Sequence, residues 1–164
     1  MREIHRILVP VDFSDCSRAA LECAVMLAER FGASIHVLHV WETPHYVGPE
    51  FLIREPGETG SPLEKAAFTQ AETEMYEFLS AFRPREEQFR VRLESGKPYE
   101  TIVKLAADEH FDAIVMGTHG SSGLRHLVLG SVAEKVVRTA PCPVMTIRQP
   151  EAAHGAASMA EAPG

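Results

Sequence analysis

A glycine-rich stretch in the second half of the chain has the residue types and spacing of an anion-binding loop. It runs Gly117-Thr118-His119-Gly120, then nine residues, then Gly130-Ser131. Glycines allow positive φ angles and let a backbone approach a ligand with no Cβ in the way. The stretch leads into a predicted helix at Ser131, where free N–H groups and the helix dipole favour a phosphate. The spacing therefore predicts a phosphate site built from backbone N–H groups.

The charges around this loop favour the same interpretation. No Asp or Glu occurs between Asp112 and Glu134, although the formal net charge of the chain is −7. The basic or titratable residues in that interval are His119, Arg125 and His126. An acidic chain lacks the Lys and Arg that sequence-independent nucleic-acid binding requires, so no nucleic-acid partner is expected. Any anion site must instead be built locally.

An ordinary surface loop is the competing interpretation. In that case Ser131 is the N-cap of the following helix, and Ser131-Val-Ala-Glu134 is a capping box. Four glycines between residues 117 and 130 exceed what a simple cap needs. The chain contains neither the Walker motif with its lysine nor G-x-G-x-x-G after its first strand, which favours a mononucleotide over a P-loop ligand or a dinucleotide.

The elements that must position this loop follow from hydrophobic periodicity and helix-cap signals. Ser14 is placed to cap a first helix that Gly32 ends. Strands are expected at 6–11, 34–41, 88–94, 113–116 and 144–147, and helices at 14–31, 62–82, 98–110 and 131–139. Strands that alternate with helices in this way predict an α/β fold, a parallel sheet covered on both faces.

In such a sheet, ligands bind at the carboxyl ends of strands where the strand order reverses. The strands at 6–11 and 113–116 are the most apolar and are therefore expected at the centre of the sheet. Asp12 follows the first of them and Gly117 the second. If these strands are neighbours, the two residues face one crevice. Asp12 is then either a ribose contact or only a turn residue.

The remaining segments suggest one domain over residues 1–148. A long connection at 42–61, rich in Pro and Gly, is interpreted as a lid, a binding loop or a disordered segment, and residues 149–164 as a disordered tail. No apolar run approaches the ~20 residues of a membrane helix, and no signal peptide is recognisable. Cys16, Cys23 and Cys142 have no metal-binding spacing, and a cytoplasmic protein with reduced thiols is expected.

The loop pattern, G-x-x-G followed by nine residues and G-S, resembles the nucleotide-binding signature of the universal stress protein family. ILVPVDFSDCSRAAL near the start, DAIVMGTHGSSGLRHLVLGSVAEKVV and PCPVMTIR are also similar to that family. The resemblance covers residues 4–148 apart from the variable middle. It implies a single-domain, Rossmann-like open sheet with strand order 3-2-1-4-5 and a homodimer paired through the last strand, Val144–Ile147.

The resemblance also implies roles for individual residues in binding an adenine nucleotide. Asp12 would contact the ribose or adenine, and Pro10, Val11 and Val40 would wall the adenine. Met116 and Gly117 would lie beside the sugar. Gly120, Gly130, Ser131 and Val132 would hold the phosphates through backbone N–H groups and the Ser131 hydroxyl. Arg125 would be an additional phosphate contact.

The function expected from these features is a nucleotide-dependent stress-response sensor or switch that binds ATP with Mg²⁺ and acts on a protein partner. A slow ATPase or autophosphorylating enzyme is one alternative, and a dimeric chaperone-like interaction module is another. Phosphoryl transfer needs a metal-binding carboxylate and a base. The loop contains no carboxylate, so Mg²⁺ would be held mainly by phosphates and water, and binding is expected to exceed hydrolysis.

Overall fold

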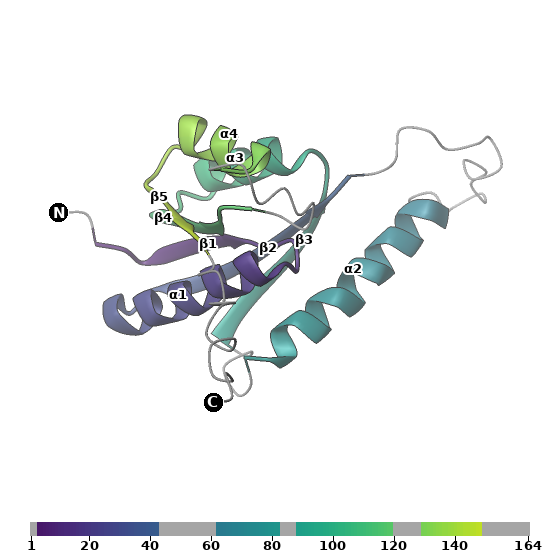
Figure 1. Cartoon of the computed structure of the whole chain (residues 1–164), viewed down its shortest axis with the longest axis horizontal. Coiled ribbons are helices and arrows are strands. Elements are labelled where there is room, and N and C mark those ends of the chain that lie inside the picture. The colour runs from purple at the N-terminus through teal and green to yellow at the C-terminus, as the bar shows by residue number, and fades with distance from the viewer. Residues whose placement is uncertain (1–2, 43–61, 83–87, 120–128, 149–164) are drawn as a thin grey trace, which may run out of the picture.

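The structure of the chain is a computed structural model that describes residues 3–42, 62–82, 88–119 and 129–148. Strands and helices alternate throughout (Figure 1). In chain order they are β1 (Arg6–Pro10), α1 (Asp15–Phe31), β2 (Ser34–Trp41), α2 (Pro62–Ser80), β3 (Phe89–Ser95), α3 (Pro98–Asp108), β4 (Ala113–Gly117), α4 (Ser131–Thr139) and β5 (Val144–Ile147). Their bounds lie within a residue or two of those expected from the sequence.

The five strands form one parallel sheet in the order β3-β2-β1-β4-β5, which confirms the predicted fold. The strands β1 and β4 are neighbours, with Ile7 beside Ala113 and Leu8 beside Ile114. The chain therefore moves outward from β1 to β3 on one side and returns to β4 on the other. The point where the strand order reverses lies between β1 and β4, as the sequence predicted.

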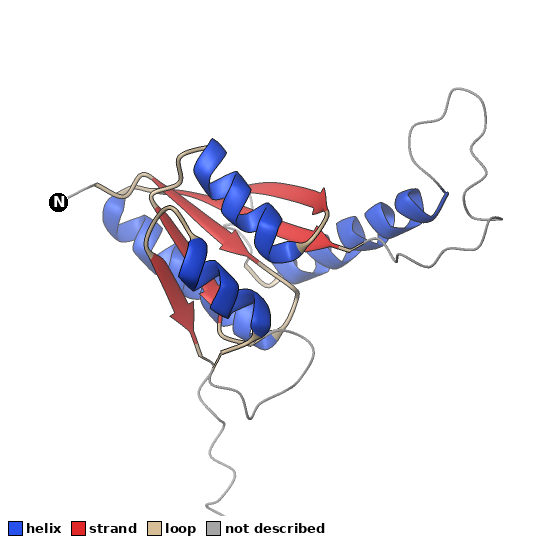
Figure 2. Cartoon of the chain, turned by 90° about the horizontal axis from the view of Figure 1, so that it is seen from above, coloured by secondary structure: helices blue, strands red, loops and turns tan. Residues whose placement is uncertain are grey.

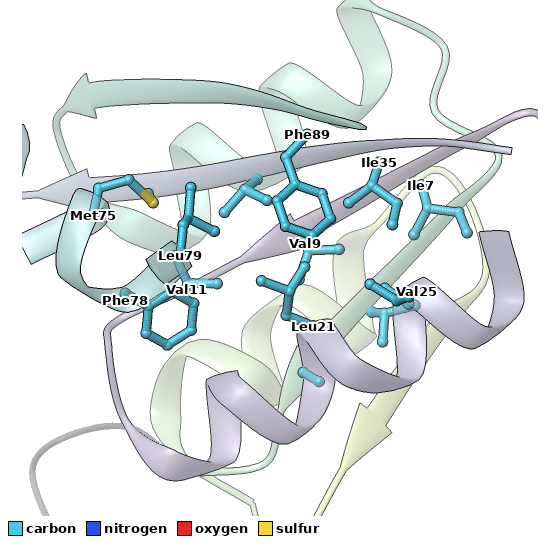
Figure 3. Packing of buried hydrophobic residues seen from close by; sticks show 14 residues of the cluster. Ile7, Val9, Val11, Leu21, Val25, Ile35, Met75, Phe78, Leu79 and Phe89 are labelled. Atoms are coloured by element: carbon cyan, nitrogen blue, oxygen red, sulfur yellow. The ribbon is translucent and has the colours of Figure 1, made fainter. Parts of the chain in front are cut away.

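Helices cover both faces of the sheet, with α3 and α4 in front and α1 and α2 behind in Figure 2. Alternate side chains of one strand enter different cores: Ile7 and Val9 pack on the α1 and α2 side, whereas Leu8 packs on the α3 and α4 side. All three are fully buried. Figure 3 shows the first of these cores, in which Phe78 and Leu79 approach Val11. This double burial explains why β1 is apolar throughout.

The cap signals of α1 are confirmed. Ser14 is the N-cap, and its side chain accepts a hydrogen bond from the N–H of Ser17 at 3.2 Å. Gly32 ends the helix in the left-handed conformation, with φ of 69°, and donates its N–H to the carbonyl of Ala28. Ser14 thus fixes where α1 begins, which is beside the carboxyl end of β1, and Gly32 fixes where it ends.

Two expectations fall on residues outside the described ranges: the role of the connection at 42–61, apart from its first residue, and the disordered tail at 149–164. Among the helices that are described, none has the length and apolar character needed to cross a bilayer.

Candidate functional site

A cavity of about 270 Å³ lies at the carboxyl ends of β1 and β4, where the strand order reverses. Residues that follow both strands line it, among them Asp12 and Thr118, and the start of α4 closes one side. This is the place at which open α/β sheets bind their ligands. The structure therefore brings Asp12 and Gly117 to one crevice.

One wall of this cavity is apolar. It is formed by Leu38 and Val40 of β2, Met116 of β4, and Pro98 and Ile102 of α3. Leu38, Ile102 and Met116 are at most 5% exposed, so their positions are fixed by the surrounding core. Such a wall suits a flat, weakly polar group, whereas the polar residues of the cavity lie toward β1, β4 and α4.

The turn after β1 holds Asp12 in place. The Asp12 Oδ1 atom accepts hydrogen bonds from the Ser14 hydroxyl at 2.6 Å and from the Ser14 N–H at 3.2 Å. The turn role that the sequence left open for Asp12 is thus observed. It does not exclude a ligand, because a carboxylate has a second oxygen and several lone pairs.

Between these two residues, Phe13 adopts a left-handed conformation with φ of 63°. A bulky side chain at positive φ is a strained exception in proteins, and strain of this kind often lies at functional sites. The Phe13 ring stacks on His39 with centroids 4.3 Å apart and meets Phe78 of α2 edge-on at 5.7 Å. The Nδ1 atom of His39 lies 2.9 Å from the carbonyl of Val11, a cavity residue. Phe13 therefore connects the cavity turn to α2.

The N-terminus of α4 opens into the cavity without a side-chain cap. The N-cap is Gly130, at φ of −70° and ψ of 156°, and no side chain caps the helix there within the described residues. The capping box of the competing interpretation is not formed, because Ser131 is the first helical residue rather than the cap. The positive φ that glycine would allow at Gly130 is not used, since its backbone is extended in a way that any residue can adopt.

Backbone hydrogen bonds join the residue before α4 to the end of β4, and the end of β4 to β5. Gly130 donates its N–H to the carbonyl of Thr118 at 2.7 Å, and Thr118 donates its own to Ile147 at 2.9 Å. The predicted donation from the Gly130 N–H to a phosphate is therefore corrected, because that N–H is already engaged. The first-turn N–H groups of Ser131 and Val132 have no intrahelical acceptor, as at every helix start.

Gly117 has a structural reason to be glycine. A Cβ built there would lie 2.9 Å from both the carbonyl carbon and the Cβ of Cys16, closer than side chains approach one another. Its φ is not positive; among the described glycines only Gly32 and Gly96 have positive φ. The residue is small because β4 ends against the first turn of α1.

Every predicted site residue that the structure describes lines the one cavity: Pro10, Val11, Asp12, Val40, Met116, Gly117, Gly130, Ser131 and Val132. Their role in binding nucleotide stays a prediction. Gly120 and Arg125, also predicted, lie outside the described residues.

Several cavity residues were not predicted: Ser17, Leu38, Pro98, Ile102, Thr118, His119 and Ala133. The alternation of strand side chains could have found Leu38, because it lies two positions from Val40 and so on the same face. Pro98 and Ile102 stand four apart at the start of a helix and so share its face, but no local signal showed that this face meets the cavity. His119, one of the basic or titratable residues of the loop, has its Nδ1 atom 3.0 Å from the Thr118 hydroxyl.

No cluster of three or more potential metal ligands is found among the described residues. The two histidines of β2 lie on opposite faces of the sheet, as expected from their spacing. His36 meets Phe111 on the α3 side, with ring centroids 4.8 Å apart, whereas His39 meets Phe13 on the other side.

These features define a doubly wound α/β protein with a cavity at its switch point and a helix N-terminus beside it. The chain belongs to the universal stress protein family, whose model matches residues 3–148. This agrees with the resemblance seen in the sequence.

Two relatives illustrate the match. A universal stress protein of Thermus aquaticus is 36% identical over 143 residues, which are 87% of this chain and 97% of that protein. A universal stress protein of Methanocaldococcus jannaschii is 32% identical over 150 residues, or 89% of this chain and 83% of that protein.

Solved structures share the fold. The universal stress protein UspA from Lactobacillus plantarum superposes with a TM-score of 0.70 at 28% identity, over 90% of this chain and 100% of that one. A universal stress protein from Archaeoglobus fulgidus in complex with dAMP gives 0.61 at 24% identity, over 89% and 99%. A universal stress protein in complex with cAMP gives a TM-score of 0.59 at 20% identity, over 89% of this chain and 98% of that one.

Proposed function

We propose that this chain binds an adenine nucleotide, ATP with Mg²⁺, in the cavity between β1 and β4, and that the bound nucleotide sets the state of a stress-response switch. The observation that carries this proposal is the start of α4. That helix begins at Gly130 without a side-chain cap and borders a cavity that is otherwise lined largely by apolar residues of β2, β4 and α3. One end of the cavity thus suits phosphates and the other suits a base.

The base and sugar fit the wall formed by strands and α3. Adenine would lie against Val40, Met116 and Ile102, where its faces lose contact with water. Asp12 stands at the end of β1 and is held by the Ser14 hydrogen bonds. Its carboxylate would accept hydrogen bonds from ribose hydroxyls, which is the usual role of an acidic residue near a nucleotide sugar.

The phosphates would lie at the first turn of α4. The N–H groups of Ser131 and Val132 and the Ser131 hydroxyl are the donors there, because the Gly130 N–H is bound to Thr118. Gly120 and Arg125 would add contacts from the loop. Asp12 is the only carboxylate among the described cavity residues and lies on the sugar side. Mg²⁺ would therefore be held mainly by phosphate oxygens and water.

Two structures of the same fold are complexes with adenine nucleotides, dAMP and cAMP. At their level of identity the likeness concerns the fold alone, so they show only that other proteins of this fold hold adenine nucleotides. The triphosphate is proposed from the G-x-x-G, nine residues, G-S pattern and the start of α4.

The expected result of the direct test is that the purified protein releases ATP or ADP on denaturation, as identified by mass spectrometry. Calorimetric titration of nucleotide-free protein with ATP should then give saturable binding, and GTP should bind more weakly because the apolar wall is matched to adenine. Turnover should stay below about one per minute, because the loop between Gly117 and Gly130 contains no carboxylate and Asp12, the one carboxylate among the described cavity residues, is assigned to the sugar. Release of no nucleotide, together with no heat on titration, would refute the proposal.

The switch is proposed to act through Phe13. Nucleotide bound at Asp12 would alter the Asp12–Phe13–Ser14 turn, and the Phe13 ring would pass that change to Phe78 of α2. The chain has one tryptophan, Trp41, and its ring lies 5.9 Å from that of Phe68, also in α2. Trp41 emission is therefore a built-in reporter of how α2 packs on the sheet.

Phe13→Asn should separate binding from this response. Asparagine tolerates the left-handed conformation but removes the ring. We expect ATP affinity to stay within about threefold of wild type, a change in binding free energy well below the 1.4 kcal/mol that corresponds to tenfold. The ATP-induced change in Trp41 emission should be lost. An unchanged emission response in Phe13→Asn would show that α2 senses the nucleotide by another route.

A homodimer paired through β5 is also proposed. The strand β5 is an edge of the sheet, and Met145 on it and Val137 on α4 are 44% and 47% exposed. Covering these side chains with a second copy would remove apolar surface from water.

A further inference from the structure

The opposite edge of the sheet, formed by β3, is open in the described part of the chain. There β3 pairs only with β2, from Phe89 beside Ile35 to Ser95 beside Trp41. Every second residue of an edge strand turns its N–H and C=O groups outward, where another strand can pair with them. Side chains on the two faces of the sheet flank this β3 edge.

On one face, an apolar groove of about 510 Å³ runs between β3 and α2, which lies alongside it in Figure 1. Phe68 and Tyr76 of α2 line the groove together with Val91 and Leu93 of β3. Phe68, Tyr76 and Val91 are 41%, 64% and 46% exposed. Large apolar side chains gathered in this way along one groove mark an interaction surface more often than scattered ones do.

The other face of β3 carries Arg90, Arg92 and Glu94, and Glu94 lies 3.9 Å from Arg92. Arg92 pairs with Glu109 at the end of α3, and Arg6 pairs with the same carboxylate at 2.9 Å. Partial burial opposes ionisation of Glu109, but the hydrogen bonds and charges of Arg92 and then Arg6 outweigh it and lower its pKa. This carboxylate is therefore ionised at neutral pH and shared between two guanidinium groups.

Arg90 is left without an ion pair among the described residues, and it is exposed. It stands beside His36 in the register of β2 and β3. Burial, followed by the charges of Arg6 and Arg90, lowers the pKa of His36, so its imidazole is neutral at pH 7. Positive charge on Arg90 thus stays uncompensated on the edge of a chain whose net charge is −7.

We propose that the β3 edge is a docking site for an extended segment of a partner protein in which apolar and acidic residues alternate. The segment would pair with the backbone of β3 as an added strand. Because strand side chains alternate between faces, its apolar residues would enter the groove beside Val91 and Tyr76, and its acidic residues would stand opposite Arg90 and Arg92. One edge thereby selects both the spacing and the charge of its ligand.

A second copy of this chain matches the edge less well. Antiparallel pairing of the full length of β3 with its own copy, Phe89 opposite Ser95, puts Arg92 directly opposite Arg92, although it also puts Arg90 opposite Glu94. Like charges in that position destabilise a strand pair. It would also bring together the grooves of both copies, each of which is lined by the carboxylate of Glu72.

The test uses the full chain and a fluorescein-labelled synthetic peptide of alternating valine and glutamate, with fluorescence anisotropy as the readout. We expect saturable binding, and binding at least about tenfold weaker for a peptide in which lysine replaces glutamate, because opposite-charge pairs become like-charge pairs. Arg90→Glu should weaken binding of the glutamate peptide to the same degree and strengthen binding of the lysine peptide. Arg138→Glu changes net charge equally on α4 and should alter neither.

The groove is tested separately with Val91→Lys, which replaces an exposed side chain and so leaves the fold intact. Its matched control is Met26→Lys on α1, where Met26 is 63% exposed. Val91→Lys should lower peptide affinity at least about tenfold, and Met26→Lys should leave it unchanged. Absence of saturable binding would overturn the proposal, as would affinities that Arg90→Glu and Val91→Lys leave unchanged. Light-scattering masses that grow with concentration and fall in Val91→Lys would assign the edge to a second copy instead.

Discussion

Gly130→Asp is expected to abolish ATP binding while leaving the protein folded and at least as stable. The backbone at Gly130 is extended, with φ of −70° and ψ of 156°, which is the conformation of an ordinary N-cap. An aspartate there would cap α4 by accepting hydrogen bonds from the N–H groups of Val132 or Ala133, and it would compete with the phosphates for the first turn of the helix. Its negative charge, favourable beside the helix dipole, would repel the triphosphate.

The size of this effect follows from the bonds that are lost. Hydrogen bonds to charged groups contribute about 1.5–3 kcal/mol each, and two of them are replaced by repulsion, so affinity should fall at least about 100-fold. Titration calorimetry gives the affinity, and thermal unfolding followed by circular dichroism gives the stability.

The control is Gly130→Asn, which provides the same cap without the charge. It should lower the affinity for ATP less than Gly130→Asp does. Its melting temperature should be close to that of Gly130→Asp. If both variants bind ATP like the wild type, the phosphates do not lie at α4, and the proposed orientation of the nucleotide is wrong.

The sequence predicted the fold closely because its signals are local and consistent. Ser14 and Gly32 mark the two ends of α1. The strands β1 and β4 are apolar on both faces, and such strands can be buried only at the centre of a sheet that helices cover on both sides. The strand order came from resemblance to a family. Once β1 and β4 are neighbours, the carboxyl-end residues Asp12 and Gly117 must meet.

What the sequence could not predict depends on contacts between distant segments. Nothing next to Phe13 in the chain indicates a left-handed backbone for an aromatic residue; the ring contacts to His39 and Phe78 hold it there. The capping box at Ser131 failed for a similar reason. Its spacing was satisfied, but α4 begins at Ser131 with Gly130 as its N-cap, one residue earlier than the motif requires.

Gly117 shows how a residue of a binding motif can be fixed by packing instead. The family resemblance gave it a place beside the sugar, and it does line the cavity. Yet the direction in which its side chain would point leads to the backbone of Cys16 and Ser17 at the start of α1, not toward a ligand. The requirement for glycine therefore belongs to the packing of β4 against α1, which in turn positions Asp12 and the cavity.

Gly117→Ala should consequently lower stability far more than it lowers affinity. Its Cβ would stand 2.9 Å from two atoms of Cys16, one of them backbone that cannot turn aside. Overpacking of this kind costs about 1–3 kcal/mol, which corresponds to a fall in melting temperature of about 2–12 °C for a domain of this size. Circular dichroism measures that fall, and calorimetry well below the transition should give an ATP affinity within about threefold of wild type.

A second glycine separates crowding from backbone conformation as the cause. At Gly32 a Cβ meets no atom within 4 Å, but φ is 69°. Gly32→Ala should therefore be destabilising through strain alone, and Gly32→Asn should recover part of the loss because asparagine tolerates that conformation. Gly117→Asn should be worse than Gly117→Ala, since a larger side chain meets the same backbone. If Gly117→Ala instead keeps its stability and loses ATP, the glycine serves the ligand directly, and the start of α1 is not what demands it.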